Sequence, residues 1–125
     1  MQLLLDTHTL LWWLADDPIL RPEAKTAIAD AESRVALSAV VVWEIGLKKS
    51  IGKLRAPDDL GERISANRFD PLPVTLEHAY RVGDLPPLHR DPFDRMLVAQ
   101  AQLEGLTIVT RDPRIAAYGV PTITA

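Results

Sequence analysis

Cysteine is absent from the 125-residue chain. Disulfide bonds and thiolate metal sites are therefore excluded, which fits a cytoplasmic protein. No apolar run approaches the roughly 20 residues that a membrane-spanning helix needs. The apolar N-terminal stretch is interrupted by Asp6, His8 and Asp16 and has no basic leader, so we do not expect a signal peptide. We expect a cytoplasmic protein that does not associate with a membrane.

An excess of positive charge is also missing. The chain has 14 basic and 17 acidic residues, a formal net charge of -3. Proteins that bind nucleic acid through bulk electrostatics are usually basic. A nucleic-acid substrate would therefore have to be met by a local basic rim, by bound cations, or by both. The length and the hydrophobic fraction of 47% predict one soluble globular domain over residues 1–125.

Short apolar runs alternate with segments of helical periodicity. The runs predict strands at residues 2–5, 35–38, 72–74, 106–110 and 121–123. The other segments predict a helix capped by Thr7, a short helical turn at 112–117, and helices at 22–32, 39–50, 57–67, 76–82 and 92–104, the last ended by Gly105. This order predicts an α/β fold, with a central, mainly parallel sheet covered by helices on both faces.

Four acidic residues lie at the ends of predicted elements, within stretches that otherwise have the composition of a core. Asp6 follows the first strand and Asp112 follows the strand at 106–110, so both belong to the sheet edge where ligands bind. Glu44 lies in a helix that is apolar nearly all round, and Asp94 precedes an apolar helical turn. Carboxylates are seldom buried unless they are paired or coordinate a metal. We therefore predict one shared cation site.

The ligand set would consist of oxygen atoms, which suits Mg²⁺ or Mn²⁺ rather than zinc. Asp6 and Asp94 are expected as direct ligands, with Glu44 and Asp112 acting directly or through water. Bound cations would activate a water and neutralise a phosphate. Simpler roles remain open, because Asp112 precedes Pro113 and could begin a turn. For Asp91, which precedes the helix at 92–104, capping is the favoured role.

Basic residues cluster near these acids in the sequence. Seven of the fourteen lie within about ten residues of a candidate acid: Lys48, Lys49, Lys53, Arg90, Arg95, Arg111 and Arg114. Each one alone fits an ordinary solvated face, but their joint placement favours phosphate contacts. We predict Arg95, Arg111, Lys48 and Lys49 as these contacts, with Arg95 and Arg111 as the best candidates.

Aromatic residues and histidines have weaker patterns. Trp12 and Trp13 are adjacent, so we expect one to be buried and the other to be available to a protein partner. Trp43 shares a helix face with Val40 and Leu47 and is expected in the core. A structural role is favoured for His8 over that of a general base. His78 and His89 show no ligand spacing.

Three segments, LLLDTHTLLWWL, SAVVVWEIGLKKSIGKL and HRDPFDRMLVAQAQLEGLTIVTRD, together resemble the PIN-domain family, and specifically VapC-like ribonuclease toxins of type II toxin–antitoxin systems. No single segment is decisive, but the three in register are a strong signal, and the resemblance covers nearly the whole chain. It implies a PIN-like three-layer α/β/α sandwich. It also implies a Mg²⁺-dependent endoribonuclease, with Mn²⁺ able to substitute, that hydrolyses RNA phosphodiester bonds with a metal-activated water.

The resemblance further implies roles for particular residues and partners. Asp6, Glu44, Asp94 and Asp112 take the acidic catalytic and metal-binding positions of the family, with Asp91 and Thr7 as auxiliary residues. The implied partners are an RNA substrate, a cognate antitoxin that blocks the active site, and a second copy in a homodimer. The resemblance does not identify the RNA.

Two other functions compete with this hypothesis. A phosphatase of the haloacid-dehalogenase pattern would use Asp6 as nucleophile, but it requires a second aspartate where this chain has His8. A non-catalytic RNA- or protein-binding module on the same fold would tolerate changes of the acids to amides. The complete set of acids argues against such a module.

Overall fold

The computed structural model describes residues 1–125 and contains one five-stranded, wholly parallel sheet in the order β3-β2-β1-β4-β5. The strands are β1 (Gln2–Leu5), β2 (Arg34–Ser38), β3 (Asp70–Leu72), β4 (Thr107–Thr110) and β5 (Thr122–Thr124). The helices are α1 (Thr7–Leu14), α2 (Pro22–Ala29), α3 (Ala39–Ser50), α4 (Leu60–Ser65), α5 (Leu76–Asp84), α6 (Pro92–Glu104) and α7 (Pro113–Ala116). The predicted α/β class with a parallel sheet is confirmed.

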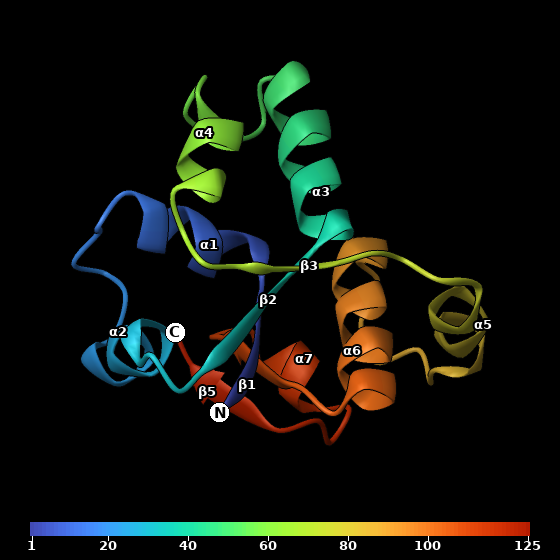
Figure 1. The fold of residues 1–125 in the computed structure, drawn as a ribbon. Helices are drawn as coiled ribbons and strands as arrows, with labels where there is room; N and C mark the ends of the chain where they lie inside the picture. The colour runs from blue at the N-terminus through green and yellow to red at the C-terminus, as the bar shows by residue number, and fades with distance from the viewer.

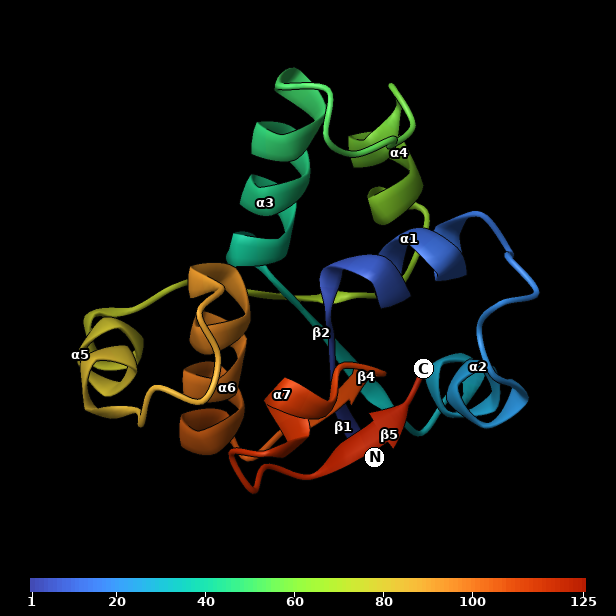
Figure 2. The ribbon, with the colours of Figure 1, turned by 180° about the vertical axis from the view of Figure 1, so that it is seen from behind.

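The core lies on the central strands. Leu3, Leu4 and Leu5 of β1 are fully buried, as are Ile108 and Val109 of the neighbouring strand β4. Neither strand alternates apolar and polar residues along this buried part, because helices cover both faces of a parallel sheet. Figures 1 and 2 show these helices flanking the sheet, with α3 and α4 projecting at one end of the molecule. None of the helices has the length and apolar character needed to cross a membrane.

Helix starts follow directly on the carboxyl ends of the central strands. Asp6 caps α1 and Asp112 caps α7, and each carboxylate accepts a hydrogen bond of 2.9 Å from a backbone N–H two or three residues later. Asp91 caps α6 in the same way, at 3.0 Å from the N–H of Asp94. The partial positive charge of a helix N-terminus favours an acid there. The chain thus places carboxylates at one edge of the sheet by ordinary helix capping.

The structure corrects several sequence predictions of the elements. The cap of α1 is Asp6 and not Thr7, because the Thr7 hydroxyl bonds to a side chain on another helix. Helix α2 ends at Ala29, where Asp30 becomes extended, and α4 begins only at Leu60. Strand β3 lies two residues earlier than predicted. Gly105 ends α6 as predicted, in the left-handed region at a φ of 67°.

The expectation that Trp43 is a core residue is wrong, because its exposed fraction is 63%. The buried stripe of α3 is Val40, Val41, Glu44 and Ile45, and this stripe faces α1 and α6. Trp43 lies outside it, with its ring edge against Phe93 at 5.0 Å between centroids. Helix α3 therefore buries an acid while it exposes a tryptophan.

Trp12 and Trp13 are both half-buried, so the expected division into one buried and one free residue is also wrong. The Trp12 ring stacks with His8, and the Arg111 guanidinium lies over it at 4.4 Å from the ring centroid. The indole N–H of Trp13 donates to Asn67 at 3.0 Å. Both rings thus have partners within the chain.

Candidate metal centre

A cavity of about 670 Å³ opens at the carboxyl edge of the sheet. Every acid singled out in the sequence lines it: Asp6, Glu44, Asp91, Asp94 and Asp112. They come from the starts of α1, α6 and α7 and from the second turn of α3. The other lining residues are Thr7, His8, Trp12, Lys48, His89, Arg90, Arg111, Pro113 and Arg114. The topology thus gathers five carboxylates from distant parts of the sequence.

Glu44 is held in place by two other side chains. It is buried, with an exposed fraction of 6%. Its carboxylate accepts a hydrogen bond from the Thr7 hydroxyl and forms an ion pair with Lys48 one helical turn later. The hydrogen bond to Glu44 is also the main reason that the pKa of Lys48 is raised. Lys48 lies 4.0 Å from Asp91 as well, so one ammonium group balances two acids.

Asp94 is the most perturbed acid of the cavity. Burial raises the pKa of its carboxyl to about 7, and the charges of Asp91, Asp6, Glu44 and Asp112 add to the effect in that order. The four carboxylates therefore repel the Asp94 charge, and a bound cation would relieve this repulsion. An all-oxygen donor set with excess negative charge fits a hard divalent cation. The residues present thus fit the metal that the sequence predicts.

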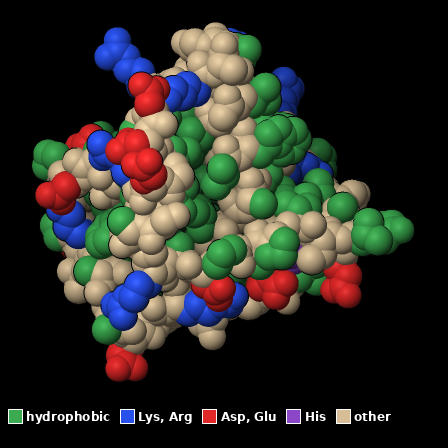
Figure 3. Space-filling model, turned by 45° about the horizontal axis from the view of Figure 1, so that its top comes forward, with side chains coloured by type: hydrophobic (Ala, Val, Ile, Leu, Met, Phe, Trp, Pro, Cys, Tyr) green, Lys and Arg blue, Asp and Glu red, His purple; other side chains and the backbone are tan.

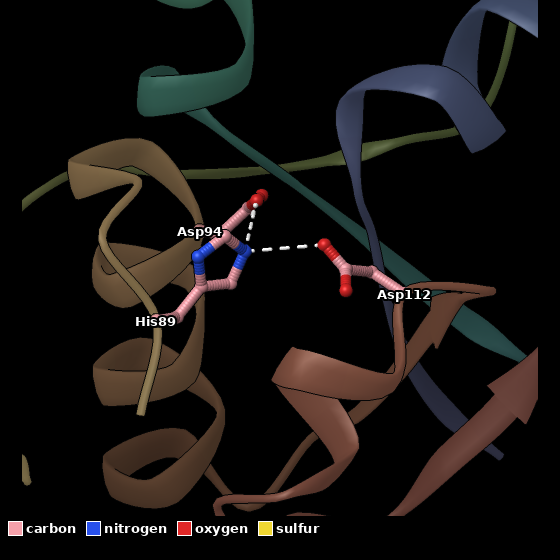
Figure 4. Close-up of side chains that lie close together, drawn as sticks. All are labelled: His89, Asp94 and Asp112. Carbon is pink, nitrogen blue, oxygen red and sulfur yellow. Dashed lines mark hydrogen bonds and ion pairs between the residues drawn. The ribbon is translucent and has the colours of Figure 1, made fainter. Parts of the chain in front are cut away.

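His89 joins two of the acids across the cavity (Figure 4). Its Nε2 lies 3.0 Å from Asp94 Oδ2 and 3.1 Å from Asp112 Oδ2. Burial alone would raise the pKa of Asp112, but hydrogen bonds from Arg114 and His89 outweigh it and lower that pKa. A search for ligand spacing misses His89 because its contact with Asp112 spans 23 residues. The available signal in the sequence is that His89 lies two residues before Asp91, and therefore close to the acidic cavity.

The structure brings only some of the predicted basic residues to the cavity. Lys48 and Arg111 line it, and so do Arg90 and Arg114. Lys49 does not line it and pairs with Asp58 at 2.6 Å. Arg114 binds Asp112 through two hydrogen bonds of 3.1 Å, whereas Arg90 has no ion pair and no hydrogen bond from its side chain.

Arg95, one of the two best candidates for a phosphate contact, points away from the cavity. Its guanidinium donates to the carbonyl oxygens of Val82 at 3.0 Å and Pro86 at 3.1 Å, and to the Tyr118 hydroxyl at 3.0 Å. These bonds tie the loop before α6 to the body of the protein. Its position in the sequence, next to Asp94, could not reveal this, because the loop folds back over the helix.

Replacing Arg95 with alanine is therefore expected to lower the free energy of unfolding by about 2–3 kcal/mol, since several acceptors, two of them half-buried, lose a charged donor. Urea unfolding measures this loss. Arg90→Ala is the matched control and should change stability by less than about 0.5 kcal/mol. RNA affinity should show the opposite pattern. The folded Arg95→Ala protein should bind RNA as the wild type does, whereas Arg90→Ala should bind it more weakly. An Arg95 variant that is fully stable but weak in RNA binding would contradict this assignment.

The protein is an α/β domain with an acidic centre. Its parallel sheet brings carboxylates together at the carboxyl ends of the strands. The family model of the PIN domain matches residues 3–121, and the chain belongs to the PIN domain family. The resemblance seen in the sequence is thereby confirmed. PIN domains are nucleases and generally use divalent metal ions. Membership of the family therefore supports nuclease activity for this protein, without specifying the nucleic acid.

Solved structures with the same fold include VapBC2 from Rickettsia felis bound to a DNA fragment of its promoter, with 14% identity, a TM-score of 0.74 and 98% of each chain covered. A toxin–antitoxin complex from Klebsiella pneumoniae has 24% identity and a TM-score of 0.66, covering 97% of this chain and 95% of that one. FitAcB from Neisseria gonorrhoeae has 25% identity and a TM-score of 0.62, covering 98% and 96%. No curated protein gives a significant match.

Proposed function

We propose that the protein is a Mg²⁺-dependent endoribonuclease that acts as the toxin of a type II toxin–antitoxin pair. The observation that carries the proposal is the set of five carboxylates in one cavity, with Asp94 so crowded that burial and its neighbours raise its pKa to about 7. Membership of the PIN domain family supports nuclease activity. The toxin–antitoxin complexes among the similar structures support the biological role.

In this proposal the acids hold the cation and the other residues hold the acids. Asp6 and Asp94 are direct ligands, and Glu44 and Asp112 act directly or through water. When bound, one or two Mg²⁺ or Mn²⁺ ions would neutralise the scissile phosphate and activate a water. The Thr7 hydroxyl orients the Glu44 carboxylate, and Asp91 caps α6 so that Asp94 faces the cavity.

The RNA backbone would meet the basic residues at the rim of the same cavity. Arg111 and Lys48 stay in the predicted set of phosphate contacts, and Arg90 and Arg114 join it because they line the cavity. Arg95 and Lys49 leave the set because neither lines the cavity. This local rim allows a chain of net charge -3 to approach a polyanion. The proposal includes a single PIN domain over residues 1–125. It also includes a cytoplasmic location, where an RNA substrate is present.

Purified protein, free of antitoxin, should cleave an end-labelled RNA in Mg²⁺ or Mn²⁺, and excess EDTA should stop the reaction. The matched substrate is a DNA of the same sequence, which should remain intact. Size exclusion before the assay separates the activity from contaminating nucleases. Cleavage that persists in EDTA would refute the metal-dependent mechanism, and cleavage of DNA alone would refute the RNA substrate.

Protein partners belong to the same proposal: a cognate antitoxin whose basic side chain meets the acids of the cavity, and a second copy of the chain in a homodimer. Hydrophobic side chains gather on the face shown in Figure 3. Helix α3 exposes Val42, Trp43 and Leu47, and Ile51 is exposed at its C-cap. This apolar face of α3 is a better anchor for a partner than Trp12 or Trp13, because Trp43 is exposed and the other two are half-buried.

Trp43→Ala is expected to weaken dimerisation or antitoxin binding about tenfold or more, because an exposed tryptophan at an interface is often a main contributor to affinity. Sedimentation and titration calorimetry measure the two equilibria. Tyr80→Ala removes another exposed aromatic, from α5, and serves as the control. Unchanged dimer mass and unchanged antitoxin affinity in Trp43→Ala would exclude the α3 face as an interface.

A further inference from the structure

His89 is buried against the acidic cavity, with an exposed fraction of 5%, and both of its ring nitrogens are engaged. Nδ1 accepts a hydrogen bond of 3.2 Å from the backbone N–H of Asp91. An imidazole nitrogen that accepts a hydrogen bond carries no proton, so the proton of the neutral ring resides on Nε2. The Nε2 nitrogen donates to Asp112 Oδ2 at 3.1 Å, and it lies 3.0 Å from Asp94 Oδ2.

We propose that His89 is a positioning residue of the acidic centre: its Nε2–H donates to Asp112 while the same nitrogen lies 3.0 Å from Asp94, and so it sets the separation of the two carboxylates without binding the cation itself. The inference rests on the proposed function, because it concerns how the chain prepares its metal ligands. Asp94 belongs to α6 and Asp112 caps α7, so the imidazole joins two separate helices. Figure 4 shows the ring between them.

The hydrogen bond to Nδ1 argues against the alternative, in which His89 is a ligand with Asp94 and Asp112. The ligand atoms of these three residues lie within 4.8 Å of one another, close enough for a common ion. However, Nε2 would have to lose its proton to bind a metal, and the neutral ring would then carry a proton on Nδ1. That proton would face the N–H of Asp91, which leaves two buried donors opposed. Metal-binding histidines usually show the opposite pattern, with the second nitrogen donating to an acceptor.

A second set of contacts holds the imidazole in place. The backbone N–H of His89 donates to the Tyr118 hydroxyl at 3.0 Å, and the same hydroxyl accepts a bond of 3.0 Å from Arg95. Arg95 also donates hydrogen bonds to the carbonyl oxygens of Val82 in α5 and Pro86 in the loop that precedes His89. The ring is thus fixed from its backbone side and from Nδ1. This rigidity is what a positioning role requires, because a mobile donor could not define a distance between two acids.

The tautomer can be tested without any metal. Long-range ¹H–¹⁵N correlation spectra of the metal-free protein should show His89 with its proton on Nε2 and an unprotonated Nδ1. In the Mn²⁺-loaded protein, electron spin echo spectra should show no directly bound nitrogen. A proton on Nδ1, or a nitrogen coupling that disappears in His89→Ala, would overturn the proposal and make His89 a ligand.

Variants test the consequence for metal binding. His89→Ala should weaken Mn²⁺ binding about 10- to 100-fold, as the loss of supporting residues does in other metal sites. His89→Gln should restore most of the affinity, because its amide N–H reaches the place of Nε2–H. Equal affinity of wild type and His89→Ala, or no rescue by glutamine in a folded variant, would refute the positioning role. Absence of Mn²⁺ binding by the wild type would refute the proposed function instead, while the tautomer still tests the hydrogen bonds of His89.

Discussion

Asp94→Asn is expected to abolish RNA cleavage and, at the same time, to stabilise the metal-free protein at pH 8. The catalytic loss should be at least about a hundredfold, since a metal ligand contributes several kcal/mol to the transition state. The protein should nevertheless gain stability, because the ionised Asp94 carboxylate is buried among four other acids. A neutral amide of the same shape removes that repulsion. A residue kept for catalysis at the expense of stability should behave in this way.

The size and pH range of the stabilisation follow from the pKa of Asp94, which rises from 3.8 to about 7 on folding. The folded carboxyl binds its proton more tightly than the unfolded one, so its contribution to stability is lost as the pH rises between these values. Each pKa unit corresponds to about 1.4 kcal/mol, which gives at most about 4 kcal/mol above pH 7. The advantage of Asp94→Asn should therefore be small at pH 4 and grow to about 2–4 kcal/mol at pH 8.

Urea unfolding in EDTA, at several values between pH 4 and pH 8, measures this difference. Asp84→Asn is the matched control, because Asp84 is exposed at the end of α5 and does not line the cavity. That variant should follow the wild type within about 0.5 kcal/mol across the range. An Asp94→Asn protein that is less stable than the wild type at pH 8 would contradict the electrostatic account of the cavity.

The second large effect is expected from the metal itself. Mg²⁺ or Mn²⁺ at a hundred times its Kd should raise the free energy of unfolding by about 2.7 kcal/mol. The affinity should fall up to about tenfold for each pH unit below 7, because Asp94 must lose its proton before it binds a cation, and the burial and repulsion that raise its pKa to about 7 hold that proton. Above pH 7 the affinity should level off.

Calorimetric titrations in buffers of different ionisation enthalpy measure both the affinity and the protons released. Close to one proton per bound cation should be released at pH 6, and far fewer at pH 8. Asp94→Asn should bind weakly and without this pH dependence, while Asp84→Asn should behave as the wild type does. An affinity that is the same at pH 6 and pH 8 would show that Asp94 does not bind the cation.

The convergence of the acids could be predicted from the sequence, because their placement depends on the order of the elements and on the topology of a parallel sheet. Asp6 and Asp112 follow strands, and Asp91 has the pattern of a helix cap. The burial of Glu44 follows from the apolar composition of α3, and the structure confirms it. The carboxylate cavity could thus be predicted from the positions of the strands and helices.

Side-chain partners across the fold could not be predicted in the same way. His89 reaches Asp112 over 23 residues, and Arg95 turns back onto the loop before its own helix. Periodicity predicts that Trp43 lies in the core, but the direction in which α3 packs on α1 and α6 buries a different stripe. These errors concern which face of an element meets its neighbour, which depends on packing rather than on spacing in the chain.

The central claim is that the gathered carboxylates would hold a divalent cation with which the protein hydrolyses RNA, and Asp6→Asn tests it most directly. Wild-type protein, Asp6→Asn and the control Asp84→Asn are purified in parallel, checked for equal folding by circular dichroism, and incubated with one labelled RNA in Mg²⁺. The account predicts the same cleaved ends for wild type and Asp84→Asn, and no cleavage by Asp6→Asn. Undiminished cleavage by a folded Asp6→Asn protein would contradict it.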